Sequence, residues 1–170
     1  MEAQQRRERI AHRLEQADGP VSATTLAKEF AVSRQIIVGD VALLRASGLD
    51  IAATPRGYVL PAGVGGIRFT VACSHTAADM ERELNTIVDQ GGTVLDVIVE
   101  HPIYGQITAP LRLSSRYEVS EFVRRCREQE AAPLSLLTDG VHLHTVVCQD
   151  PLCETRVKKA LREQGILLED

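Results

Sequence analysis

Two histidines separated by a single residue, His142 and His144, are the first residues whose types and spacing predict chemistry. They follow Asp139-Gly140, a strong signal for a two-residue hairpin turn. On a strand, residues two apart point to the same face, so the two imidazoles would lie side by side. Such a pair would supply half of a metal site. Alternating histidines also occur on exposed strands, and the pair alone leaves that interpretation open.

The remaining ligands of such a site must come from other parts of the chain. His75 follows an alternating apolar stretch and precedes a predicted helix, on which Asp79 and Glu83 share a face. Three imidazole nitrogens and one carboxylate form a ligand set that zinc, nickel, iron and manganese all accept, and affinity favours the later metals of that series. Cys73, two residues before His75, is a reserve ligand.

Length and composition limit the class of protein. The chain has 170 residues, which allows one medium domain or two small ones, and its 44% hydrophobic and 25% charged residues are ordinary for a soluble globular protein. No apolar run reaches the length of a membrane span, and the charged N-terminus is not a signal peptide. We therefore expect a cytoplasmic protein in which all four cysteines are reduced thiols: Cys73, Cys126, Cys148 and Cys153.

The first sixty residues predict three short helices followed by a small β-hairpin. Ser22 and Ser33 are good N-caps for the second and third helices, and Gly48 is a typical helix end. The helices are expected at 6–17, 23–30 and 33–47, and the hairpin strands at 51–53 and 58–60. This order is typical of a winged helix-turn-helix.

The stretch from Ser22 to Leu60, with its VSRQ and RGY tokens, resembles the helix-turn-helix of biotin-repressor-type regulators. The resemblance implies that the third helix enters the major groove of a double-stranded DNA operator. The residues that it places at the DNA are Ser33, Arg34, Gln35 and Arg56. The alternative interpretation of these side chains is plain solvated surface, since the first sixty residues carry eight Lys and Arg against seven Asp and Glu.

The rest of the chain predicts a second domain. Pro61 to Gly66 is a composition break, so we place a winged helix-turn-helix domain at 1–62 and a second domain at 66–170. The second domain shows the order β-α-β-β-α-β-β-α-β, which indicates an α+β sandwich with a mostly antiparallel sheet and helices on one face. Its later elements are expected as a hairpin of 134–137 with 141–148, a helix from Pro151 capped by Asp150, and a last strand at 166–168.

Three segments of the second domain, CSHT, VEHPIYG and DGVHLHT, resemble the three-histidine (3H) ligand-sensing domain of niacin-responsive repressors. The resemblance covers about residues 6–168 and implies a homodimeric repressor of NAD biosynthesis, niacin salvage or transport genes. It further implies nicotinic acid as co-repressor and a divalent metal, nickel, zinc or iron, on His75, Glu83, His142 and His144.

The sequence defines the residues that would contact the effector less closely than it defines the metal ligands. His101 keeps the HPxYG signature of that family, and with Tyr104 it forms the rim of a possible pocket, although a turn residue bonded to its own backbone is the simpler interpretation. Arg112, Arg116 or a backbone N–H would hold the carboxylate of nicotinate. The pyridine nitrogen would ligate the metal directly.

Two other functions remain open at this stage. The chain could sense the metal itself, with niacin irrelevant, or it could be a metal-dependent hydrolase joined to a DNA-binding module. No Ser/His/Asp order, phosphate loop or paired-carboxylate motif stands out, and Asp79 is the one general base that the pattern offers beside the metal. We therefore expect a regulator and no enzyme.

Overall fold

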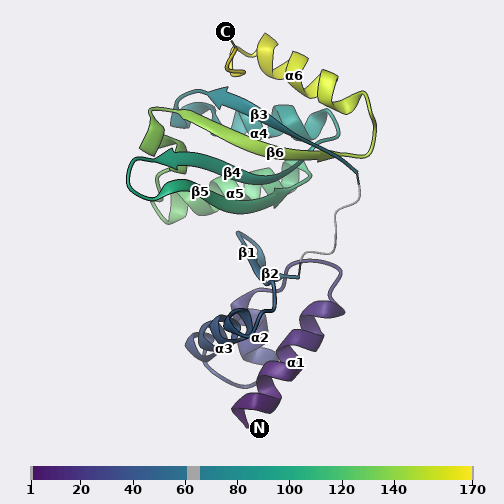
Figure 1. Cartoon of the computed structure of the whole chain (residues 1–170), viewed down its shortest axis with the longest axis vertical. Coiled ribbons are helices and arrows are strands. Elements are labelled where there is room, and N and C mark those ends of the chain that lie inside the picture. Colours follow the sequence, from purple (N-terminus) through teal and green to yellow (C-terminus); the bar gives the residue numbers. More distant parts are fainter. Residues whose placement is uncertain (1, 61–65, 170) are drawn as a thin grey trace. The chain divides into compact units, whose positions relative to one another are not determined.

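The computed structural model describes residues 2–60 and 66–169, and the chain divides into two compact units, residues 1–63 and 64–170 (Figure 1). The linker predicted at 61–66 falls almost wholly outside the described residues. Among the described residues, no helix is both long and apolar enough to cross a membrane.

The N-terminal unit contains three helices and a two-stranded hairpin. They are α1 (Ala3–Glu15), α2 (Ala23–Glu29), α3 (Arg34–Ala46), β1 (Ala52–Thr54) and β2 (Gly57–Val59). The two predicted caps are present, because the hydroxyl of Ser22 accepts the N–H of Thr25 and that of Ser33 accepts the N–H of Ile36. The hairpin strands lie one residue from their expected positions.

The core of this unit holds the recognition elements together. Apolar side chains from all three helices form it, with Ile10, Leu26 and Ile37 fully buried. The hairpin is attached through Val21, which pairs with Tyr58 in an isolated bridge. Helices α2 and α3 therefore have a fixed geometry within the unit, as a helix-turn-helix requires.

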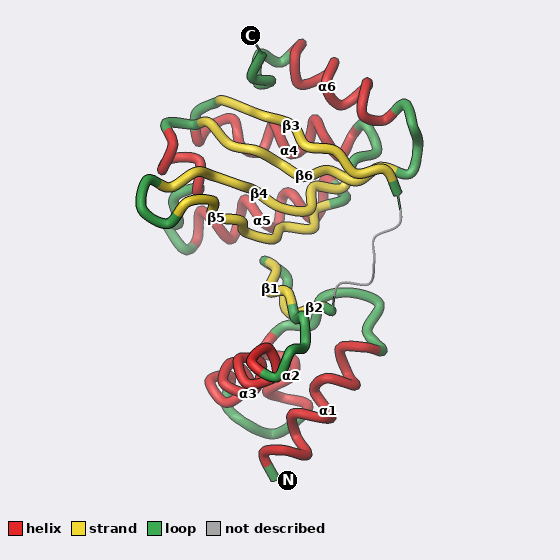
Figure 2. Tube along the Cα trace, in the orientation of Figure 1, coloured by secondary structure: helices red, strands yellow, loops and turns green. Residues whose placement is uncertain are grey.

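The C-terminal unit is built on a four-stranded sheet in the order β3-β6-β4-β5, with every neighbouring pair antiparallel (Figure 2). The strands are β3 (Ile67–Ser74), β4 (Thr93–His101), β5 (Gly105–Leu113) and β6 (Val141–Cys148). The helical segments are η1 (Ala77–Asp79), α4 (Met80–Asp89), α5 (Arg116–Glu128), η2 (Leu134–Thr138) and α6 (Cys153–Glu163).

The helices of this unit share one core with one face of the sheet. Alternate residues of β3 and β6 are buried in that core, Val71 and Val146 among them, together with Leu84 of α4, Val119 of α5 and Val157 of α6. The tubes of α4 and α5 lie behind the sheet in Figure 2. The prediction of an α+β fold with an antiparallel sheet is confirmed.

The prediction of a strand at 134–137 is wrong, because residues 134–138 form the 3-10 helix η2. Both edges of β6 already pair with β3 and β4, so no edge remains for a hairpin partner. Asp139 and Gly140 do make a tight turn, with φ of 51° and 93°. The turn joins η2 to β6 and not two strands.

Two features at the C-terminal end also differ from the predictions. Helix α6 begins at Cys153 and not at Pro151, and the Asp150 carboxylate accepts the N–H of Leu152 in the preceding turn. The expected last strand is only an isolated bridge between Leu167 and Cys73.

The expectation of four reduced thiols is also corrected. Cys148 and Cys153 form a disulfide, because the short turn between β6 and α6 brings their Cα atoms to 6.0 Å. Cys73 and Cys126 are free.

Candidate metal centre

Two neighbouring strands position the histidines of the C-terminal unit. In β6 the side chains of His142 and His144 alternate with partly exposed residues and point into the core. His142 pairs with Cys73 of β3, and His144 pairs with Val71 of the same strand. The C-terminal end of β3 therefore lies beside the two histidines. His75 is the first residue after that strand. The three imidazoles therefore lie in a row, with ring centroids 4.8 Å and 4.9 Å apart.

Glu83 is the carboxylate at which the three rings meet. It belongs to α4, which packs on the same face of the sheet, and only 1% of the residue is exposed. Its Oε2 lies 2.5 Å from Nε2 of His75, and its Oε1 lies 2.7 Å and 3.1 Å from Nε2 of His142 and His144. The structure thus brings together all four residues predicted as metal ligands. Asp79, the other candidate carboxylate, pairs with Arg82 instead.

The opposite nitrogen of each ring is bonded to a backbone carbonyl. Nδ1 of His75 lies 2.6 Å from the Thr76 oxygen, Nδ1 of His142 lies 2.8 Å from the Gly140 oxygen, and Nδ1 of His144 lies 2.7 Å from the Asp96 oxygen. A carbonyl oxygen only accepts, so each Nδ1 must carry the proton. In a neutral ring, Nε2 then has no proton and presents a lone pair.

Three lone pairs facing one carboxylate would repel it, because neither side has a proton to share. Either the rings are protonated or a cation lies between them and Glu83. His144 makes the need plain: its buried Nε2 has no hydrogen bond of acceptable angle, although Glu83 is 3.1 Å away. The arrangement therefore fits a metal ion, and backbone-bonded imidazoles are how proteins usually orient metal-ligating histidines.

Charge in the cluster follows from this geometry. Burial alone would disfavour ionised Glu83, yet the charge of His144 and the hydrogen bonds that the rings donate when they are protonated hold the pKa of Glu83 well below its usual range. Burial also works against protonated His75 and His144, but Glu83 outweighs it and raises the pKa of both rings. Glu83 therefore stays ionised, and when the rings are neutral it is a buried negative charge that a cation would balance.

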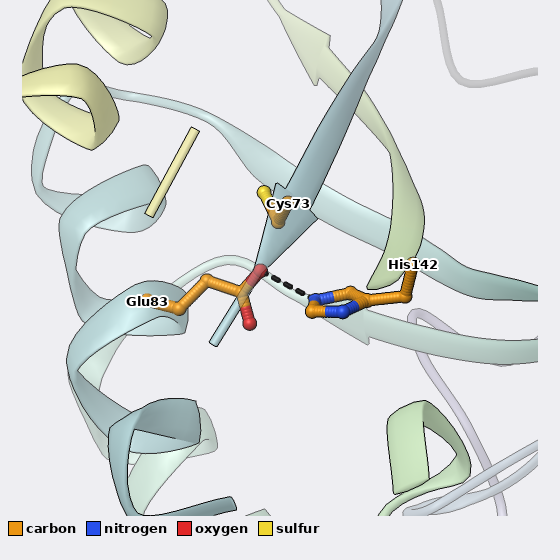
Figure 3. A group of neighbouring side chains, drawn as sticks. All are labelled: Cys73, Glu83 and His142. Atoms are coloured by element: carbon orange, nitrogen blue, oxygen red, sulfur yellow. Dashed lines mark hydrogen bonds and ion pairs between the residues drawn. The ribbon is translucent and has the colours of Figure 1, made fainter. Parts of the chain in front are cut away.

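Cys73 adds a fifth possible ligand. Its sulfur, a Glu83 oxygen and a His142 nitrogen all lie within 4.8 Å of one another (Figure 3). Burial, and then the charge of Glu83, raises the pKa of the Cys73 thiol, which opposes the thiolate form that metals bind. We therefore place Cys73 beside the histidine set and not within it.

Gly140 holds two parts of the site together. Its carbonyl oxygen accepts the His75 N–H at 3.4 Å as well as Nδ1 of His142. A Cβ on Gly140 would come within 2.4 Å of the His75 carbonyl oxygen, so only glycine allows this approach. The sequence signalled the turn but not this contact, and it gave no sign that the Asp96 carbonyl bonds to His144.

The structure also shows the surroundings of the three residues predicted to bind the effector. Nδ1 of His101 accepts the N–H groups of Ile103 and Tyr104, which is the turn role expected as the simpler interpretation. Tyr104 is exposed, and Arg112 lies on the edge strand β5 with a φ of 55°. His101 is five residues along β4 from Asp96, the strand's contact to His144, or roughly 16 Å.

The four predicted DNA contacts are in the helix-turn-helix unit. Ser33 caps α3, Arg34 and Gln35 form its exposed first turn, and Arg56 lies in the turn between β1 and β2. The structure thus places three of them at the N-terminus of one helix and the fourth on the hairpin.

Comparison with known proteins covers both units. A family model described as an HTH domain matches residues 6–59, and one described as a 3H domain matches residues 68–170. The probable transcription repressor NiaR of Thermotoga maritima is 43% identical over 167 residues, which cover 98% of this chain and 95% of the relative. The transcription repressor NadR of Bacillus subtilis is 41% identical over 169 residues, covering 97% and 94%.

Both relatives match the chain from end to end, so the likeness covers the helix-turn-helix and the histidine cluster together. The 3H match includes every residue of that cluster. The chain therefore belongs to the family of transcription repressors that join a helix-turn-helix domain to a 3H domain.

Proposed function

We propose that this protein is a DNA-binding repressor of NAD biosynthesis or niacin transport genes, and that it acts as a metal-loaded homodimer with nicotinic acid as co-repressor. The observation that carries the proposal is the convergence of three Nε2 atoms on the buried Glu83, each ring being fixed by a backbone carbonyl. A chain that carries such a cluster in one unit and a helix-turn-helix in the other suits a sensor that acts on DNA.

The metal would be held by His75, Glu83, His142 and His144. A set of nitrogen and carboxylate donors suits nickel, zinc or ferrous iron. When bound, such an ion offers an open position as a Lewis acid, which the pyridine nitrogen of nicotinic acid would fill. The chain's own residues orient the donors and exclude water from the buried carboxylate.

The coupling between effector and DNA is a linkage of two binding equilibria. If nicotinic acid favours the dimer geometry that matches two operator half-sites, it raises DNA affinity, and the operator raises nicotinic acid affinity by the same factor. A coupling of this kind typically amounts to about 5- to 150-fold.

The test is an operator gel shift with nickel-loaded protein, with and without nicotinic acid, repeated after chelation. We expect nicotinic acid to tighten binding and the chelator to abolish that gain. If neither agent changes the affinity, the proposal is wrong. Calorimetry of nicotinic acid binding separates a repressor that senses niacin from one that senses the metal alone, because only the first gives heat.

A variant with both strand histidines replaced checks the ligands. His142→Ala combined with His144→Ala should lose the bound metal, counted by elemental analysis, and with it the response to nicotinic acid. The separate core of residues 10–60 should stay folded, as measured by its circular dichroism. An unchanged metal content would refute the ligand assignment.

A further inference from the structure

The exposed surface of α3 is apolar to an unusual degree. Ile36, Val38 and Leu43 are 42%, 40% and 55% exposed. They lie outside the side of the helix that is buried in the core. Exposed apolar side chains grouped on one element mark a binding surface. The HTH match covers this helix, so we take this surface as the one that would face DNA.

The centre of that surface carries no charge. Gln35, Val38, Gly39 and Ala42 are all exposed, and their spacing puts them on one face of α3. Gln35 is the one side chain among them that can form hydrogen bonds, and no hydrogen bond to it is found among the described residues. A Cβ on Gly39 would meet nothing within 4 Å, so this face is open.

Two of the three charged residues of α3 are held away from this face. Asp40 is buried and pairs with Arg6 of α1, with Nε and Oδ2 2.6 Å apart. Arg45 donates to the Ile51 carbonyl and lies over the Tyr58 ring. Arg34, in the exposed first turn, lies at the edge of this face. The face therefore lacks the Arg or Lys that usually reads guanine.

We propose that α3 reads A·T base pairs, with Gln35 bonding adenine and with Val38 and Ala42 packing on thymine methyl groups. Gln pairs with N6 and N7 of adenine, and apolar side chains contact the thymine C5-methyl, which other bases lack. The absence of a side chain at Gly39 lets the helix backbone come close to the groove floor. This inference rests on the proposed DNA-binding function.

The experiment begins with selection from a random-sequence duplex library, using the full chain with nickel and nicotinic acid and, in parallel, without either. We expect half-sites with a run of A·T pairs where α3 binds. Each thymine of the selected site is then replaced by deoxyuridine, which removes only its methyl group. At one or two positions per half-site, affinity should fall about fourfold, as expected for one buried methyl group.

Two variants assign the contacts. Val38→Ala should lose the sensitivity to deoxyuridine at one of those positions, and Gln35→Ala should lose roughly 5- to 150-fold of discrimination at one adenine. Both side chains are exposed and alanine favours a helix, so folding is preserved. Leu152→Ala removes an apolar side chain of the sensor unit that is even more exposed, 67% against 40% for Val38; it is the control and should change neither.

The outcomes separate this inference from the function on which it rests. A library without any enriched sequence contradicts DNA binding itself and the inference with it. An enriched site that is G·C-rich under α3, or that ignores deoxyuridine at every position, overturns the inference and leaves the DNA-binding repressor intact. The same holds if Val38→Ala changes the oligomeric state instead of the sequence preference, because the apolar face then contacts protein.

Discussion

At the scale of single residues, the proton on each histidine decides what the cluster can do. Three backbone carbonyls fix the Nδ1–H form of His75, His142 and His144, which frees Nε2 in each ring. A buried carboxylate opposite three such nitrogens is costly unless the rings are protonated or a cation joins them. The same four side chains without the carbonyl bonds would be a set of polar residues with no defined ligand.

The first prediction concerns Glu83, the one charged ligand. Glu83→Gln keeps the shape but removes the charge, so metal affinity should fall by more than the roughly 10- to 100-fold that loss of a supporting partner costs. Isothermal titration with nickel measures it. Glu81→Gln is the matched control, since Glu81 lies on the same helix with an exposed side chain that faces Arg127. Equal affinities in both variants would contradict the assignment of Glu83.

The second prediction tests Gly140 as the residue that positions His75 against His142. Gly140→Ala and Gly165→Ala both put alanine at a positive φ, 93° and 69°, and this strain costs about 1–3 kcal/mol in either case. Only at Gly140 does the new Cβ meet backbone, the His75 carbonyl oxygen at 2.4 Å, whereas nothing lies within 4 Å at Gly165. Gly140→Ala should therefore also weaken metal binding.

The readout for this pair of variants is the visible absorption of bound cobalt(II), which depends on how the ligands are arranged. Gly165→Ala should keep the spectrum and the affinity of the parent protein, while Gly140→Ala should change both. If the two variants lose stability alike and keep the same spectrum, Gly140 has only a structural role.

At the scale of elements, local signals in the sequence predicted most of the fold. Ser22 and Ser33 each cap a helix as expected, because an N-cap needs only the residues next to it. Ser115 caps α5 in the same way, since its hydroxyl accepts the N–H of Glu118.

The error at 134–137 has a different origin. Leu134 to Leu137 is apolar and lies before a turn signal, so local pattern favours a strand, but strand pairing is decided by the whole sheet. Because β3 and β4 take both edges of β6, the segment forms a short helix instead. The pairing of His142 with His144 was predictable, since residues two apart on a strand share a face. The carbonyls that orient them were not, since a backbone oxygen leaves no trace in side-chain pattern.

The third prediction belongs to helix α3 and separates capping from DNA contact. Ser33→Asp keeps an N-cap acceptor and so should change the free energy of unfolding by less than about 0.5 kcal/mol. The added negative charge next to phosphates should reduce DNA affinity by roughly three- to tenfold at low salt. Fluorescence anisotropy with operator DNA and a urea titration measure the two effects.

The control for this change is Ser115→Asp, which makes the same replacement at the cap of α5 in the sensor unit. It should leave both the unfolding free energy and DNA affinity as they are. A loss of affinity in both variants would show that charge acts at a distance and that Ser33 is not at the DNA.

At the scale of the whole molecule, the chain has two cores with no shared member. One holds buried residues between Ile10 and Ile51, the other those between Phe69 and Ile166. All four proposed metal ligands belong to the second unit. Under the proposed function, a signal from the metal would reach the DNA through a change in how the two helix-turn-helix units of the dimer are presented, since the core of each such unit contains no proposed ligand.

The fourth prediction follows from this separation. Metal that binds only the folded sensor unit stabilises that unit by about 2.7 kcal/mol at a free concentration 100 times Kd, which raises its Tm by roughly 10 °C or more. Calorimetric scans with nickel and with chelator should show one transition that moves and one, from the helix-turn-helix unit, that does not. Glu83→Gln should abolish the movement, because its sensor unit no longer holds the ion. If both transitions move together in the parent protein, the two units unfold as one, and the metal acts on the helix-turn-helix through direct packing instead of through the dimer geometry.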